Sequence, residues 1–175
     1  MSEKPMPSAQ PDGPANGVAR SPDENAFREL IRTFGLVERV MHPYFARFGI
    51  TGSQWGVLRN LHRAEEQGLP RLRLTELGER LLIRPPSVTG LVDRLERAKL
   101  VARHGSPTDL RAKQVSLTAA GRKLVQRVLA VHQEQVNAVL GGLSSQDRAD
   151  LHRLLRLWRQ NLEAALAGAT TANVS

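Results

Sequence analysis

The sequence contains no cysteine, which excludes disulfide bonds, thiolate zinc sites and the sensing of oxidants by a thiol. It has no run of about 18 apolar residues, the length that a helix needs to cross a bilayer. Its first residues lack the apolar core of a secretion signal. We therefore expect a cytoplasmic protein that has no membrane contact.

The common motifs of catalysis and of nucleotide binding are also missing. The sequence has no G-x-S-x-G, no P-loop and no glycine-rich dinucleotide motif. His62 and Glu66 are spaced by one helical turn, but two ligands make a poor zinc site. The five histidines are scattered along the chain, at His42, His62, His104, His132 and His152. We therefore expect no enzyme, no metal site and no cofactor.

Positive charge is what the sequence has in excess. Lysine and arginine number 25 against 17 aspartates and glutamates, so the formal net charge is +8. Arginine supplies most of it, because the lysines are few: Lys4, Lys99, Lys113 and Lys123. Arginine forks suit phosphates and guanine edges, so nucleic acid is the leading candidate partner. The alternative is an arginine-rich surface that only reflects a GC-rich genome.

Composition and apolar spacing divide the chain into five segments. Residues 1–22 are rich in proline, serine and glycine and have little to bury, so we expect a disordered tail. Apolar residues at spacings of three and four predict a helix over 23–50, with a kink or break where His42 precedes Pro43. The same spacing predicts two helices over 118–168, which open at Thr118 and Ser144 and are separated by a Gly-Gly break. Residues 169–175 are expected to be a flexible tail.

The middle segment, residues 51–117, begins with a helix for which Ser53 is a plausible cap. Two short helices follow in quick succession. Thr75 is expected to cap the first, over 76–82, and Pro85 and Pro86 suit the opening turn of the second, which runs to residue 98. One face of the second helix is apolar, with Val88, Leu91, Val92 and Leu95. Two helices joined by a short turn indicate a helix-turn-helix.

Residues 101–104 and 114–117 are short and strand-like, and residues 105–109 supply turn chemistry between them. They predict a β-hairpin, or wing, directly after the helix-turn-helix. The first helix and the last two helices carry more apolar surface than one small winged helix-turn-helix domain can cover, which favours an oligomer. The predicted fold is mainly α: a winged helix-turn-helix with a helical dimerisation domain built from the first helix and the last two helices.

The segment Asp109–Gly121, DLRAKQVSLTAAG, fits the pattern D-x-R-x-x-x-V-x-L-T-x-x-G. Together with LTELGERL at 74–81 and VTGLVDRLE at 88–96, it resembles the multiple-antibiotic-resistance regulator (MarR) family over residues 25 to 167. The resemblance implies a homodimer whose subunits interlock through the terminal helices. Each winged domain then presents one helix to the major groove of a double-stranded operator. It also implies that Arg111 of the wing enters the minor groove and that Asp109 holds it in place.

The face of the second reading helix away from its apolar side is the candidate for contact with bases. Ser87 and Thr89 can bond bases or phosphates, Gly90 allows close approach, and Arg94 suits a guanine or a phosphate. Pro86 either stiffens the entry turn or touches thymine methyl groups. The side chains expected on the DNA backbone are Arg84, Arg103 and Lys113. A merely solvated helix face is the competing interpretation.

Many members of the family that the chain resembles bind small aromatic or phenolic molecules between the dimer helices and the winged domain. The residues here that suit such a pocket are His42, Tyr44, Phe48 and Trp55. Phe48 and Trp55 are equally what an ordinary core would contain.

The leading hypothesis from the sequence is a repressor of pseudo-palindromic operators that a small aromatic ligand releases from DNA. The alternative is an architectural DNA-binding protein that responds to no effector.

Overall fold

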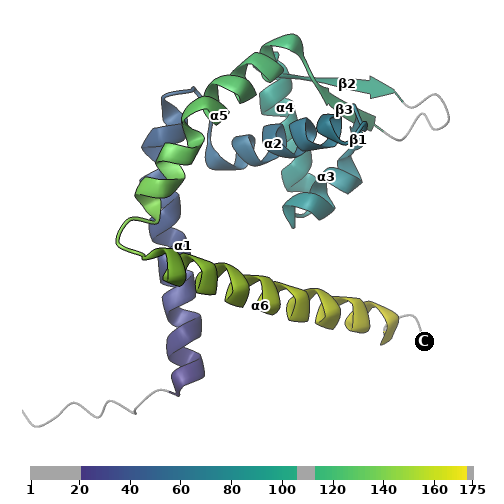
Figure 1. Cartoon of the computed structure of the whole chain (residues 1–175). Helices are drawn as coiled ribbons and strands as arrows, with labels where there is room; N and C mark the ends of the chain where they lie inside the picture. Colours follow the sequence, from purple (N-terminus) through teal and green to yellow (C-terminus); the bar gives the residue numbers. More distant parts are fainter. Residues whose placement is uncertain (1–20, 106–112, 173–175) are drawn as a thin grey trace, which may run out of the picture. The chain divides into compact units, whose positions relative to one another are not determined.

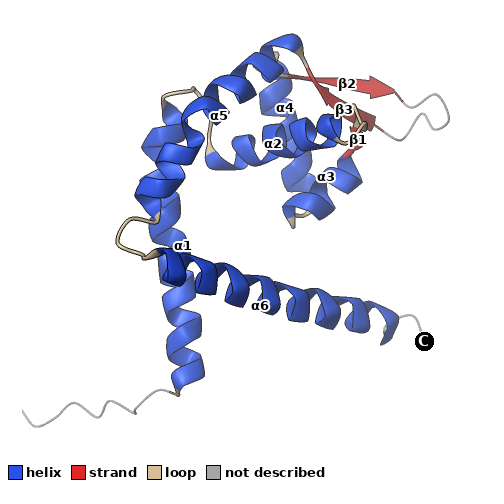
Figure 2. Ribbon diagram, in the orientation of Figure 1, coloured by secondary structure: helices blue, strands red, loops and turns tan. Residues whose placement is uncertain are grey.

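The computed structural model describes residues 21–105 and 113–172. This part of the chain is mostly helical and holds three short strands (Figure 1 and Figure 2). In chain order the elements are α1 (Pro22–Ala46), α2 (Gly52–Glu66), β1 (Leu72–Arg73), α3 (Leu74–Leu81), α4 (Pro85–Arg97), β2 (Val101–Gly105), β3 (Lys113–Leu117), α5 (Ala119–Val139) and α6 (Ser145–Ala172). A pair of short helices followed directly by a hairpin confirms the predicted mainly α, winged helix-turn-helix fold.

The hairpin lies in a three-stranded antiparallel sheet of order β1-β3-β2. β2 and β3 pair from Val101 with Leu117 to Gly105 with Lys113, as predicted for a wing. The short strand β1 was not predicted, because two residues are too few to display an alternating pattern. It forms through tertiary pairing, in which Leu72 lies opposite Val115 on the central strand.

One hydrophobic core joins α2, α3, α4 and the sheet to the first half of α5. The predicted apolar face of α4 is buried in it, which confirms that part of the sequence interpretation. Burying each such side chain stabilises the fold by about 1.5–3 kcal/mol. The largest fully buried side chains are Val57, Leu58, Leu61, Leu77, Val88, Val92, Leu95, Val115, Val125 and Val128. This core fixes the position of α4, the helix on which the candidate site is built.

The N-cap of α2 lies two residues before the predicted cap at Ser53. Thr51 is the N-cap: its hydroxyl accepts from the Gln54 amide at 3.2 Å. The Gln54 side-chain oxygen accepts in return from the Thr51 amide at 2.8 Å. This reciprocal capping box satisfies two amides that a cap at Ser53 would leave without partners.

Helix α3 also begins earlier than predicted, with Arg73 and not Thr75 at its N-cap. The Arg73 amide donates to Glu76 Oε2 at 2.7 Å. A glutamate at the third helical position can therefore cap the helix even though the capping residue has no short polar side chain.

Of the two predicted alternatives at His42-Pro43, the break is absent, because α1 continues through Pro43 to Ala46. The other alternative, a kink within a continuous helix, stays a prediction. The Arg47 amide donates to the Pro43 carbonyl at 3.3 Å, so the backbone bonds resume beyond the proline. The turn that ends the segment contains Gly49, whose φ of 71° lies in the left-handed region.

Helix α5 begins at the predicted cap. The Thr118 hydroxyl accepts from the Gly121 amide at 3.0 Å and donates to the Lys99 carbonyl at 2.7 Å. Gly121 is buried and lies directly against the Leu100 backbone. This arrangement, here called the α5 joint (Lys99, Leu100, Thr118 and Gly121), fixes the start of α5 to the chain between α4 and β2.

The terminal helices expose rows of apolar side chains. The part of α1 before Val40 forms a compact unit of its own and exposes Phe27, Ile31 and Phe34. Every residue of α6 from Leu151 to Gly168 is exposed, including Leu151, Leu154, Leu155, Trp158, Leu162 and Leu166. Among the described helices, none combines the length and the apolar character needed to cross a membrane.

Candidate nucleic-acid interface

The outward face of α4 carries most of the residues that the sequence assigns to base contact. Pro86, Ser87, Thr89 and Arg94 are exposed, and Gly90 is partly exposed. All five lie on the turns of a helix whose other face is anchored in the core. The structure therefore brings these predicted residues together on one surface, and their contact with DNA stays a prediction.

The first four helical residues of α4, Pro85 to Val88, have no free backbone N–H group to offer a ligand. Arg84 is the N-cap, and Pro85 and Pro86 occupy the next two positions, where proline lacks an N–H. The amides of Ser87 and Val88 both donate to the Arg84 carbonyl, at 3.0 and 3.2 Å. A helix N-terminus that binds a phosphate does so through such amides. Anion binding here therefore depends on side chains, and Arg84 is exposed at this point.

Gly90 has no packing role within the described chain. A Cβ added there would meet only the end of the Arg94 side chain, at 3.9 Å. Glycine inside a helix costs about 0.5–1 kcal/mol relative to alanine. The described part of the chain thus gives no packing reason for a glycine at this partly exposed position. A surface that must approach another molecule closely is a reason of another kind.

Arg103, on strand β2, joins the wing to α4. Its guanidinium lies 2.5 Å from Asp93 Oδ1 and 2.8 Å from Glu96 Oε2. It also donates to the Thr89 carbonyl at 3.4 Å, and its side chain is only 19 % exposed. The sequence assigned Arg103 to the DNA backbone, but here two carboxylates of α4 occupy its guanidinium. We expect Arg103 to position α4 against the wing.

Replacing Arg103 with methionine distinguishes the two roles. Loss of the charge-assisted hydrogen bonds should lower the free energy of unfolding by about 1.5 kcal/mol. The dependence of DNA affinity on salt concentration should keep its wild-type slope, since Arg103 neutralises no phosphate. The exposed Lys113 is the control: its replacement by alanine should reduce the slope by about 1, the change expected for one phosphate that is no longer neutralised. An equal reduction of the slope for the Arg103 variant would show that Arg103 binds the DNA backbone after all.

The wing tip carries the motif on which the family resemblance depends. Asp109 and Arg111 lie outside the described residues, so their predicted roles stay predictions. The strands that lead to them are described: Lys113 is exposed at the start of β3 and pairs with Gly105 at the end of β2. Both ends of the tip are therefore anchored on strands that belong to the core sheet.

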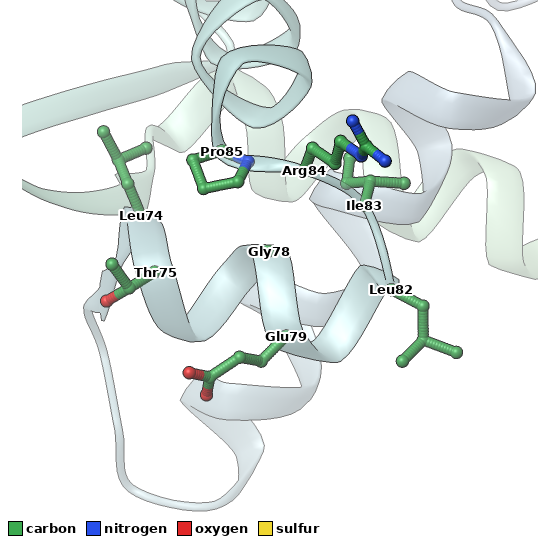
Figure 3. A pocket seen from close by; sticks show the side chains of 8 residues that line it. All are labelled: Leu74, Thr75, Gly78, Glu79, Leu82, Ile83, Arg84 and Pro85. Carbon is green, nitrogen blue, oxygen red and sulfur yellow. The ribbon is translucent and has the colours of Figure 1, made fainter. Parts of the chain in front are cut away.

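The turn between α3 and α4 depends on close packing at Gly78. A Cβ there would lie 3.2 Å from Val88 Cγ2 and 3.3 Å from the Ile83 carbonyl oxygen. A hollow of about 380 Å³ opens beside this contact (Figure 3). It is lined by Leu74, Thr75, Gly78, Glu79, Leu82, Ile83, Arg84 and Pro85. Leu82, the C-cap of α3, begins the turn. Its φ of 54° is a strained conformation for leucine, and its side chain is 81 % exposed.

Three of the four residues proposed for a ligand pocket meet in one group, which we call the aromatic cluster (Tyr44, Phe45, Phe48, Trp55 and His132). The ring centroids of Tyr44 and Phe48 are 5.5 Å apart, and those of Trp55 and His132 are also 5.5 Å apart. Tyr44 Oη donates to the Val128 carbonyl at 3.1 Å and lies 3.2 Å from His132 Nδ1. His42 is exposed and takes no part in the cluster.

His132 was not among the residues that the sequence singled out for this pocket. It lies on α5, 88 residues from Tyr44 along the chain, and no local pattern connects the two. Burial lowers the pKa of His132, and the positive charge of Arg59 lowers it further. Burial also raises the pKa of the Tyr44 phenol. The cluster is thus an apolar site with two polar groups that both favour their neutral forms.

The lowered pKa of His132 predicts a stability that depends on pH. The unfolded chain takes up this proton near pH 6.5, at a higher pH than the folded chain, so protonation favours unfolding. The contribution is fully present above that pH and is lost as the pH falls below it. Unfolding by denaturant at pH 7.5 and 5.5 should show a smaller pH effect for His132→Gln than for wild type. The exposed His152→Gln variant is the control, and equal pH effects in all three proteins would contradict the assignment.

Comparison with known proteins places this geometry in a family. A model described as MarR family matches residues 48–112. The chain is 30% identical over 122 residues to the HTH-type transcriptional repressor YetL of Bacillus subtilis. The aligned region covers 70% of this chain and 71% of that protein.

Two solved structures are similar over most of the chain. The first is BpsR of Bordetella bronchiseptica, whose structure concerns the regulation of its DNA binding by 6-hydroxynicotinic acid. It has a TM-score of 0.68 at 25% identity, and the superposed region covers 77% of this chain and 98% of that chain. A mutant MarR from E. coli in complex with operator DNA has a TM-score of 0.69 at 24% identity and covers 75% and 91%. The second likeness, at its lower identity, shows the shared fold alone.

Proposed function

The chain belongs to the MarR family of DNA-binding transcriptional regulators, and from this premise we propose that it is a homodimeric repressor of a pseudo-palindromic operator. The single observation that carries the proposal is the exposed face of α4, held rigidly to a basic wing by the contacts of Arg103. Similarity to the repressor YetL supports repression as the output.

In the proposed complex each α4 lies in the major groove and each wing reaches the neighbouring minor groove. The groups toward bases are those of Pro86, Ser87, Thr89, Gly90 and Arg94, whereas Arg84 and Lys113 bind phosphates. Arg111, oriented by Asp109, enters the minor groove, whose negative potential is enhanced where it is narrow. Arg103 contributes indirectly by fixing the angle between α4 and the wing.

The exposed apolar rows of the terminal helices support a dimer, because a lone protomer would leave them in water. We assign dimerisation to residues 23–50 and 118–168 and DNA binding to 51–117. Residues 1–22 and 169–175 receive no part in either, although α6 continues past its predicted end at residue 168 to Ala172. Two α4 helices related by a twofold axis meet successive major grooves about 34 Å apart. The twofold axis presents the same surface to each half-site in opposite directions, and this symmetry makes the operator pseudo-palindromic.

We assign the aromatic cluster to an effector, a small aromatic molecule that carries a hydroxyl or carboxylate group. Regulation of BpsR by 6-hydroxynicotinic acid supports this class of ligand. The rings of Tyr44 and Trp55 are buried in the core, so the ligand must part the cluster before it can stack on them. His132 then provides a polar partner. Such a ligand releases DNA only if it binds better to a dimer whose reading helices are wrongly spaced.

Selection from random DNA tests the operator part of the proposal. Duplexes retained by the full chain at about 150 mM salt should contain two inverted half-sites, and the chain should bind them at least about 1,000-fold more tightly than scrambled duplexes. Retention of all sequences equally would contradict a sequence-specific regulator.

The effector part is tested on the selected duplex with a panel that includes 6-hydroxynicotinate and salicylate. At least one compound should lower DNA affinity about tenfold or more, and His132→Gln should reduce that response while the exposed His42→Gln should not. A response abolished by His42→Gln would place the ligand at His42. Indifference to the whole panel would favour the architectural alternative.

A further inference from the structure

The first half of the outward face of α4 has a bare line, which ends where the charged Asp93 and Arg97 follow on the same side. Pro86 and Gly90 are four residues apart, so they follow each other along one side of the helix. That side is opposite the buried face formed by Val88 and Leu95. Pro86 presents only ring carbons and Gly90 presents no side chain. We call these two residues the α4 stripe.

The α4 stripe offers no hydrogen bond. Pro86 has no N–H, and inside a helix its carbonyl serves the amide of Gly90. Polar groups lie on either side of it, with the hydroxyl of Thr89 on one flank and the guanidinium of Arg94 on the other, both exposed. Whatever lies against the stripe itself must be apolar or must tolerate an apolar neighbour.

Neither stripe residue is explained by packing within the described chain. Pro85 already occupies the first helical position, where proline favours helix initiation, and Pro86 is exposed. A Cβ at Gly90 would have room. Pro86 thus lacks a hydrogen-bonding group and Gly90 lowers helix stability, and together they leave a smooth surface on the outward face of α4.

In the major groove of DNA the apolar group presented by the bases is the 5-methyl group of thymine. We propose that the α4 stripe reads thymine methyl groups: the ring of Pro86 packs against a methyl group, and Gly90 allows the helix axis to approach closely enough for that contact. This inference rests on the proposed function, because it requires α4 to lie in the major groove. The flanking Thr89 and Arg94 then take adjacent polar base edges or phosphates.

Deoxyuridine substitution tests the proposal, since it removes the methyl group and leaves the pairing edge intact. Each thymine of the selected duplex is replaced singly, and affinity for the full wild-type chain is measured by fluorescence anisotropy. One or two thymines in each half-site should show a loss of about fourfold, the effect of returning one methyl group to water. At those positions Pro86→Ser should bind thymine and uracil duplexes equally. Pro85→Ser, which changes the neighbouring proline that lines the hollow in Figure 3, should keep the wild-type discrimination.

A second variant keeps the test independent of folding defects. Gly90→Ala should melt at a higher temperature than wild type but bind the selected duplex several-fold more weakly, because its methyl group holds the helix away from the bases. A stabilised variant with unchanged affinity would overturn the role of Gly90.

The outcomes separate this inference from the proposed function. If a specific duplex is selected but no thymine responds to removal of its methyl group, the stripe does not read thymine and the proposed function stands. If the response persists in Pro86→Ser, another residue reads the methyl group and the proposal is overturned. If no specific duplex can be selected, the proposed function fails and this inference fails with it.

Discussion

Replacing Gly121 with alanine should lower the free energy of unfolding by about 3 kcal/mol, at the upper end of the usual range for overpacking. An added Cβ would overlap the carbonyl oxygen of Leu100 and would also lie 3.3 Å from the Leu117 side chain. The overlapping atom belongs to the backbone and cannot turn aside as a side chain can. The α5 joint must therefore move, which breaks the Thr118 hydrogen bonds that fix α5 to the chain between α4 and β2.

Denaturant unfolding of the wild type, Gly121→Ala and Gly90→Ala checks this expectation. Both glycines are in helices, but Gly90 has room for a Cβ, so its replacement should raise stability by up to about 1 kcal/mol. The two substitutions are chemically identical and should act in opposite directions. A Gly121→Ala protein as stable as wild type would show that the α5 joint is looser than the described packing.

Replacing Arg111 with alanine should weaken binding to the selected duplex about 10- to 100-fold, the usual range for one specific contact. The substitution would remove the guanidinium proposed for the minor groove, whereas the core and the terminal helices would be unaffected. The effect should be largest on duplexes with A-tracts beside each half-site, because their narrow minor groove attracts arginine most strongly.

The neighbouring Lys113→Ala is the matched control on the same wing. It should weaken binding to selected and scrambled duplexes by the same factor, because a phosphate contact carries no sequence information. Circular dichroism and sedimentation should show both variants folded and in the same oligomeric state as wild type. An Arg111→Ala protein with wild-type affinity would mean that the wing does not contact DNA.

The local spacing of apolar residues was enough to predict the winged helix-turn-helix. The spacing of Val88, Leu91 and Leu95 predicted the buried face of α4, and two alternating segments predicted the strands of the wing. These features repeat within a few residues, so the period of the helix or strand is visible in the sequence itself. The outward set from Pro86 to Arg94 followed from the same pattern by elimination.

Contacts between distant residues were beyond that method. Strand β1 forms only because Leu72 meets Val115, and the aromatic cluster includes His132 only because α5 folds back onto α2. The role of Arg103 was predicted from its charge alone, without the two carboxylates that surround it. Charge indicates which partners a residue prefers, but the fold decides whether its own chain has already supplied one.

The most direct measurement is a hydroxyl-radical footprint of the full chain on the selected duplex, combined with the number of protomers bound per duplex. The rigid unit of α4 and wing, used twice, predicts two protomers and two protected half-sites about one helical turn apart. A single protomer that protects one continuous stretch, or protection that is equal on every duplex, would contradict this account.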